Sequence, residues 1–193
     1  MKLKFSLLIF TFLLFNCGEK KESKIEYVSN DEIVEEFDRT KFPILQDAVV
    51  LKENNSLIAA IEKFDQAEKE YGPMIPIFLN RGVVYHQIGK SKESISDFSK
   101  CLIIDSNYYA ALTNRGIAYV HANQTDKAIL DLNKAIQIKP NESSTYLNRA
   151  IAFNNLDKSK LACADLKKAK ELGLMEKYGS GGIPMSLKFK CLF

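Results

Sequence analysis

Charged side chains recur at a fixed spacing in the middle of this 193-residue chain, and they are its strongest candidates for chemistry. Three arginines are each followed 16 residues later by an aspartate, in the pairs Arg81 and Asp97, Arg115 and Asp131, and Arg149 and Asp165. Such a row could bind an anion or serve catalysis. Residues that recur in every unit are nevertheless explained first by the packing of one unit on the next. We therefore expect an internal Arg-to-Asp ladder.

None of the other reactive side chains forms a recognisable catalytic or metal-binding set. His86 and His121 are the only histidines, and no carboxylate or cysteine accompanies them at the spacing of metal ligands. Gly89-Lys90-Ser91 could end a phosphate-binding loop, but Val84 stands where that loop requires a glycine. No nucleophile, base and orienting group can be assembled from the sequence. We expect no enzyme activity, no metal, no cofactor and no small-molecule substrate.

The four cysteines have different expected roles. Cys101 replaces a small residue on a helical face, so we expect it to be buried and inert. Cys163 lies in a predicted helix and Cys191 near the last residue of the sequence. An oxidising compartment would allow a bridge between these two, and the sequence leaves open whether it forms.

The charge balance excludes one class of partner. The chain has 27 basic and 24 acidic side chains, a formal net charge of +3, and 46% hydrophobic residues. This composition is ordinary for a globular domain. Nucleic-acid binding requires a clustered run of Lys and Arg, which is missing. We expect no nucleic-acid partner.

An apolar run at residues 5–15 follows Lys2 and Lys4. Eleven residues of helix extend about 16 Å, well short of a bilayer core of about 30 Å, so residues 1–16 are predicted to be an export signal. The run ends in Leu14-Phe15-Asn16-Cys17, which resembles the bacterial lipoprotein signal. That resemblance implies cleavage before Cys17 and lipid on its side chain, with a plain secretory signal as the alternative. Residues 17–40, rich in Glu and Lys, are predicted to be a solvated tether.

The sequence repeats at an offset of 34 residues. Leu79 to Tyr85 aligns with Thr113 to Tyr119 and with Leu147 to Phe153. A second set of small and large apolar residues aligns in the same way: Ser94, Phe98 and Cys101, then Ala128, Leu132 and Ala135, then Ala162, Leu166 and Ala169. Their spacings of three and four residues place each set on one helical face. Gly89, Asn123 and Asp157 lie between the two segments and tolerate a helix-ending turn.

This pattern resembles the tetratricopeptide repeat, a pair of antiparallel helices. The resemblance implies an all-α fold, a right-handed α-solenoid of helix-turn-helix units. We assign the repeat domain to residues 41–172, with a degenerate unit at 41–72 and three units at 75–106, 109–140 and 143–172. Ala60, Phe64 and Ala67 carry the degenerate unit. Residues 173–193 are a C-terminal tail, whose alternating apolar residues from Met185 to Phe193 predict a strand.

In this family the first helix of each unit lines a concave groove. Carried over, the resemblance implies a partner-binding groove that includes Leu79, Asn80, Val83, His86, Thr113, Asn114, Ile117, His121, Leu147, Asn148 and Ile151. Asn114 matches the central asparagine of family members that grip a terminal carboxylate, but Leu79, Val83, Ser144 and Asn148 replace their other polar residues. The groove is largely apolar and suits an apolar peptide or helix face.

Together these features predict a lipid-anchored protein-interaction adapter of a bacterial cell envelope, on the periplasmic or outer-membrane face. Its partner would be another envelope protein or peptide, and the N-terminal lipid would hold it at the membrane. The alternative is an accessory subunit of an envelope assembly or secretion complex. That subunit would use its convex face or its tail, and its groove would be self-filled.

Overall fold

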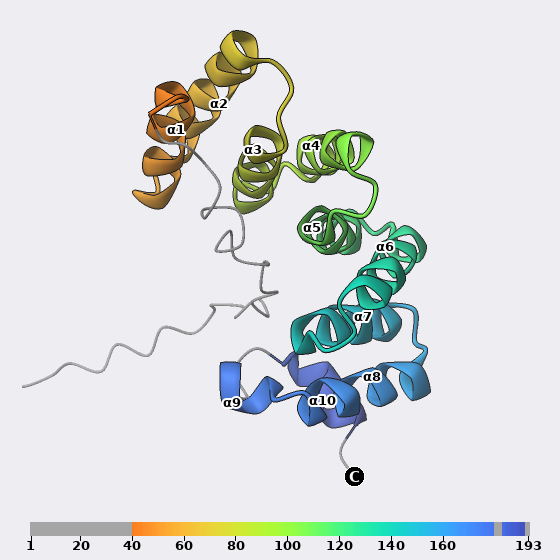
Figure 1. Ribbon diagram of the computed structural model, residues 1–193. Helices are drawn as coiled ribbons and strands as arrows, with labels where there is room; N and C mark the ends of the chain where they lie inside the picture. Colours follow the sequence, from red (N-terminus) through yellow and green to blue (C-terminus); the bar gives the residue numbers. More distant parts are fainter. Residues whose placement is uncertain (1–39, 180–182, 192–193) are drawn as a thin grey trace, which may run out of the picture.

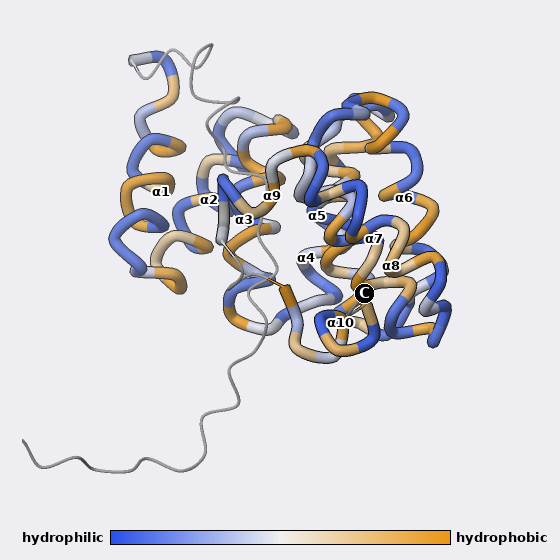
Figure 2. The backbone as a smooth tube through the Cα atoms, turned by 90° about the horizontal axis from the view of Figure 1, so that it is seen from below, coloured by the Kyte–Doolittle hydropathy of each residue, from blue (hydrophilic) through white to orange (hydrophobic). Residues whose placement is uncertain are grey.

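The computed structural model describes residues 40–179 and 183–191. Within them the chain forms ten helices and no strand: α1 (Pro43–Glu53), α2 (Leu57–Tyr71), α3 (Ile75–Gln87), α4 (Ser91–Ile104), α5 (Tyr109–His121), α6 (Thr125–Ile138), α7 (Ser143–Asn155), α8 (Ser159–Glu171), α9 (Leu174–Tyr178) and α10 (Met185–Lys190). Hydrophilic and apolar residues alternate along these helices (Figure 2). Among the described helices, none is long and apolar enough to cross a bilayer. The predicted signal, tether and Cys17 lie outside the described residues, except for residue 40.

The first eight helices pack as four successive antiparallel pairs. Each pair also contacts the next, through α2 and α3, α4 and α5, and α6 and α7. Figure 1 shows the pairs stacked along a curved path, with α3, α5 and α7 on its inner side and α4 and α6 on its outer side. The predicted α-solenoid is confirmed.

The turn inside each pair has the same conformation. Four residues spaced by 34 have positive φ angles, namely Asn55, Gly89, Asn123 and Asp157. In each case the next amide donates to a carbonyl five residues back, as from Gln124 to Tyr119 over 2.8 Å. This is a Schellman-type helix end, in which Gly, Asn and Asp tolerate the left-handed backbone. Because Asn55 follows the same rule, the degenerate first pair keeps the turn of the others.

Small residues are required where the two helices of a pair cross. A Cβ atom added to Gly82 would lie 2.7 Å from Cε1 of Phe98, and one added to Gly116 would lie 2.9 Å from Cγ of Leu132. Both large side chains are fully buried. The close approach of the helices therefore depends on the missing side chains.

The C-terminal tail differs from its prediction. Met185 to Lys190 form the helix α10 in place of a strand, and Leu187 is the residue that this helix buries. A disulfide joins Cys191, directly after α10, to Cys163 in α8. Packing of Leu187 against α8 and this covalent link favour a helical turn over the extended form, because six residues of alternating polarity are compatible with either.

Candidate functional site

The Arg-to-Asp ladder is present along the whole solenoid. The Nε of each arginine donates to the aspartate 16 residues later over 2.7 Å, from Arg81 to Asp97, Arg115 to Asp131 and Arg149 to Asp165. Each Nη1 reaches the residue 16 positions earlier, namely Asp65, Ser99 or Asn133. Every arginine thus connects the second helix of the preceding pair, its own helix and the helix after it. The arginines therefore hold the units in register.

The first rung carries more charge than the others. Arg81 contacts three carboxylates, those of Asp65, Glu68 and Asp97, at 2.6 to 2.7 Å. Burial opposes ionisation of Arg81, but hydrogen bonds and charge from Asp97 and Glu68 outweigh it and raise the pKa of the guanidinium. Arg115 and Arg149 have one aspartate each, with a neutral partner on the preceding unit.

The predicted groove residues lie on the first helices of three successive pairs, α3, α5 and α7. Nine of the eleven are between 0% and 7% exposed: Leu79, Asn80, Val83, Thr113, Asn114, Ile117, Leu147, Asn148 and Ile151. His86 is half-buried and His121 is exposed. This face is therefore closed over most of its length in the present conformation, and its role in partner binding stays a prediction.

Three asparagines form a column on this face, at equivalent positions of α3, α5 and α7. Asn80 is satisfied, since its Oδ1 accepts from Lys52 at 2.7 Å and its Nδ2 donates to the carbonyl of Pro76 at 2.8 Å. Asn114 is fully buried, and neither its Oδ1 nor its Nδ2 has a hydrogen-bond partner. The Nδ2 of Asn148 also lacks one. Buried polar atoms without partners cost about 1 to 3 kcal/mol each, so such groups mark a place where a ligand can bond.

The two histidines meet on the same side of the solenoid. The rings of His86 in α3 and His121 in α5 are perpendicular, with centroids 4.7 Å apart. Burial, together with the neighbouring His121, lowers the pKa of His86 to about 4. The sequence places these residues one unit apart but gives no sign that their rings touch.

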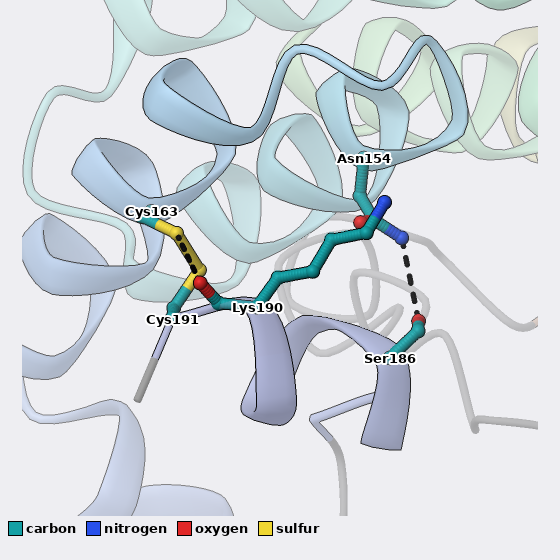
Figure 3. Close-up of a disulfide and its surroundings, with 5 residues drawn as sticks. All are labelled: Asn154, Cys163, Ser186, Lys190 and Cys191. Carbon is teal, nitrogen blue, oxygen red and sulfur yellow. Dashed lines mark hydrogen bonds between the residues drawn. A yellow bond between two sulfur atoms is a disulfide. The ribbon is translucent and has the colours of Figure 1, made fainter. Parts of the chain in front are cut away.

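The C-terminal segment covers one end of this face. Ile183, Leu187 and Cys191 belong to the same buried cluster as Leu147 and Ile151. Figure 3 shows the disulfide between Cys163 and Cys191, and the Nδ2 of Asn154 in α7 donating to Ser186 in α10 over 3.3 Å. The segment thus acts as a cap on this end of the solenoid.

Cys101 is the free cysteine of the described residues and is fully buried. Burial and the nearby Asp97 raise the pKa of its thiol to about 12, so it is a packing residue, as expected. In the described part of the chain, His, Cys, Asp and Glu side chains nowhere gather in a group of three that could hold a metal.

One cavity lies away from this face, between α4, α5 and α6. Its volume is about 320 Å³, and it is lined by Ser99, Leu102, Ile103, Ser106, Leu112, Arg115, Asp131 and Lys134. Sequence reasoning missed it, because the residues come from three helices and the loop after α4, and three of them, Ser99, Arg115 and Asp131, belong to the ladder.

Comparison with known families covers two of the helix pairs, α3 with α4 and α5 with α6. Models of the tetratricopeptide repeat match residues 75–108 and 109–142. This stretch matches two consecutive tetratricopeptide repeats. A search of curated proteins finds no match.

Solved structures of tetratricopeptide proteins share the fold. The MamA 41-end structure from Desulfovibrio magneticus RS-1 is 21% identical, with a TM-score of 0.66 over 69% of this chain and 76% of that chain. A tetratricopeptide repeat protein from Parabacteroides merdae ATCC 43184 is 18% identical, with a TM-score of 0.63 over 70% of this chain and 52% of that one. Similarity at this level of identity establishes the solenoid fold alone.

Proposed function

We propose that this chain is a protein-interaction adapter that holds an extended protein or peptide segment on the face of α3, α5 and α7. A lipid on Cys17 would anchor it to a membrane of a bacterial cell envelope. The observation that carries the binding proposal is the buried side chain of Asn114, with neither amide atom hydrogen-bonded.

An asparagine side chain offers one acceptor and an amide donor, which is the pairing that a peptide backbone needs. Asn114 and Asn148 place the same amide group at equivalent positions of adjacent units. Since Asn114 is covered in the present conformation, binding requires the covering groups to move aside. That movement breaks no hydrogen bond of the Asn114 side chain, so its cost is lowered, and a bound backbone would satisfy both atoms.

The test separates binding from folding. The double variant Asn114→Ala/Asn148→Ala should fold with unchanged or higher stability, because it removes unpaired buried groups. A photo-crosslinking residue at the exposed position 121 in the mature protein, returned to its native envelope, should trap a protein that the double variant no longer traps. The matched control is Asn133→Ala, on the second helix α6, which should still trap that protein. If the parent, the double variant and the Asn133→Ala control all capture the same protein, binding at the asparagine column is rejected.

The membrane anchor rests on the sequence from Leu14 to Cys17 and has its own test. Several acyl chains on one cysteine bury enough methylene groups for stable anchoring, whereas one chain is marginal. Radiolabelled palmitate should label the wild type and not Cys17→Ala. Undiminished label in the variant would contradict the anchor, without affecting the binding proposal.

A second candidate function is favoured by the burial of most residues on the face of α3, α5 and α7. The predicted groove residues are mostly buried, and Leu147 and Ile151 pack with the chain's own Ile183 and Leu187. In this candidate the groove is self-filled, and an accessory subunit of an envelope complex binds through its outer face or tail. Capture that survives Asn114→Ala/Asn148→Ala, but is lost in Ile103→Glu/Leu130→Glu, would select it, because both substituted side chains are exposed on the second helices.

A further inference from the structure

The C-terminal end of the solenoid concentrates positive charge. Residues 157–191 contain eight lysines and four acidic residues. Two of these acids are already neutralised, since Asp165 pairs with Arg149 and Asp157 pairs with Lys190. The chain as a whole carries a formal charge of only +3. The eight lysines outnumber the four acidic residues of this segment, so positive charge concentrates at this end of the solenoid.

Three of the lysines lie on the face of α8 to which α10 is linked. Cys163 of α8 is bonded to Cys191. On the same face of α8 lie Lys160, three residues earlier, Lys167, four residues later, and Lys170, seven residues later. All three are exposed. Lys188 extends the basic surface onto α10 itself. Figure 1 shows α10 beside α8 at the end of the stack.

Large apolar side chains project from the same cap. Leu187 of α10 is fully buried, whereas Met185 is 62% and Phe189 is 66% exposed. These two residues are one helical turn apart and therefore share a face. Met175 in the neighbouring α9 is also exposed. An apolar pair bordered by lysines is the pattern of a surface that rests in the headgroup region of a bilayer.

We propose that the end formed by α8 and α10 is a docking surface for anionic phospholipid membranes. Lysine stems are flexible and place charge against a plane of phosphates without a fixed register, whereas a folded acidic partner would favour the geometry of arginine. Met185 and Phe189 enter between the headgroups, and the disulfide keeps α10 in place on α8. The surface needs neither a lipid on Cys17 nor a protein on the face of α3, α5 and α7.

Vesicle co-sedimentation tests the surface directly. The probe protein is the chain from residue 17 onward with Cys17→Ser, which retains all ten helices and cannot be lipidated. We expect it to bind phosphatidylcholine vesicles containing about 30% phosphatidylglycerol at low salt, at least tenfold more strongly than pure phosphatidylcholine vesicles. High salt should remove this preference, because it screens the lysines. Equal binding to both vesicles, or binding to neither, would overturn the proposal.

Matched variants locate the contact. Lys160→Gln/Lys167→Gln/Lys170→Gln should weaken binding to the anionic vesicles at least tenfold, and Met185→Ser/Phe189→Ser should weaken it severalfold. The control Lys63→Gln/Lys69→Gln/Lys92→Gln removes the same charge from α2 and α4 and should bind like the parent. Far-ultraviolet circular dichroism checks that each variant is folded. An equal loss of binding in the control would assign the effect to general charge. Retention on an acidic polypeptide matrix, with no binding to vesicles, would assign it to an acidic protein. Either result would refute the membrane surface.

Discussion

The two ends of the solenoid are closed by different means. At the N-terminal end a complete helix pair, α1 and α2, covers α3, and its buried residues include Leu45, Ala48 and Phe64. The edge-to-face contact between Phe42 and Tyr71, with ring centroids 5.1 Å apart, adds to this packing. At the C-terminal end a helix of six residues buries Leu187 and is held by a disulfide.

This difference shows how a repeat protein covers its last apolar faces. Each unit of a solenoid needs a neighbour on both sides, and terminal units require a substitute. The N-terminal substitute buries enough apolar surface to hold without a covalent bond, and Arg81 of the next pair binds two of its carboxylates, those of Asp65 and Glu68. The short α10 buries much less, so we infer that its attachment depends on the cross-link from Cys163 to Cys191.

The largest effect is expected from removing the charge that joins the first two pairs. Arg81→Ala leaves the buried carboxylate of Asp97, with a side chain 4% exposed, without its guanidinium. Breaking a buried ion pair in this way costs about 3 to 5 kcal/mol. Urea unfolding followed by circular dichroism should show this loss in the free energy of unfolding.

The matched substitution near the other end is Arg149→Ala. Its aspartate, Asp165, is more exposed, and its second partner is the neutral Asn133. We expect a smaller loss of about 2 kcal/mol, from charge-assisted hydrogen bonds alone. Equal losses for the two variants would show that the extra carboxylates at Arg81 do not distinguish the ends.

The next effect concerns the disulfide. Cys163→Ala/Cys191→Ala removes a link that closes a loop of 28 residues, and such links contribute about 2 to 4 kcal/mol. Hydrogen exchange should lose protection in α9 and α10, while protection in α1 and α2 stays unchanged. Continued protection of α10 would mean that its noncovalent contacts suffice, and the contrast between the ends would disappear.

The repeat period predicts more than the helices. It places the turn residues from Gly89 to Asp157 and both members of each Arg-to-Asp rung, because every unit meets the same packing and capping demands. Outside the period the sequence is ambiguous. The alternation from Met185 to Phe189 predicts a strand, and only the docking of Leu187 and the bond to Cys163 make it helical.

The candidate site is less predictable for a related reason. Equivalent positions identify the face of α3, α5 and α7, but they do not say what covers it. Asn80, Asn114 and Asn148 occupy equivalent positions, each directly before an arginine, yet Lys52 of α1 pairs with the first one alone. That difference depends on which residue the neighbouring pair supplies. The sequence of one unit alone does not contain this information.

Acid should lower the free energy of unfolding through His86 in α3, which lies between the two ends of the solenoid. The pKa of His86 is lowered to about 4 by burial and by His121, against an ordinary value of 6.5. Between pH 6.5 and 4 the unfolded chain takes up a proton that the folded chain does not, so stability falls as the pH falls through this range. The variant His86→Gln should lose this component of the pH dependence. Thermal melting at pH 7 and pH 4.5 compares the two proteins, and an identical pH response would refute the role of His86.

The smallest effect on stability is expected at the turns inside the first and the last helix pair. Asn55 in the first pair and Asp157 in the last have φ angles of 58° and 54°, where glycine is unstrained. Asn55→Gly should raise the free energy of unfolding by about 0.5 kcal/mol, after the greater flexibility of glycine in the unfolded chain is subtracted. Asp157→Gly relieves the same strain but removes the carboxylate that binds Lys190 of α10 at 3.0 Å. Its gain should therefore be smaller or absent in urea unfolding. A larger gain for Asp157→Gly would show that the contact with Lys190 does not help to hold the C-terminal cap.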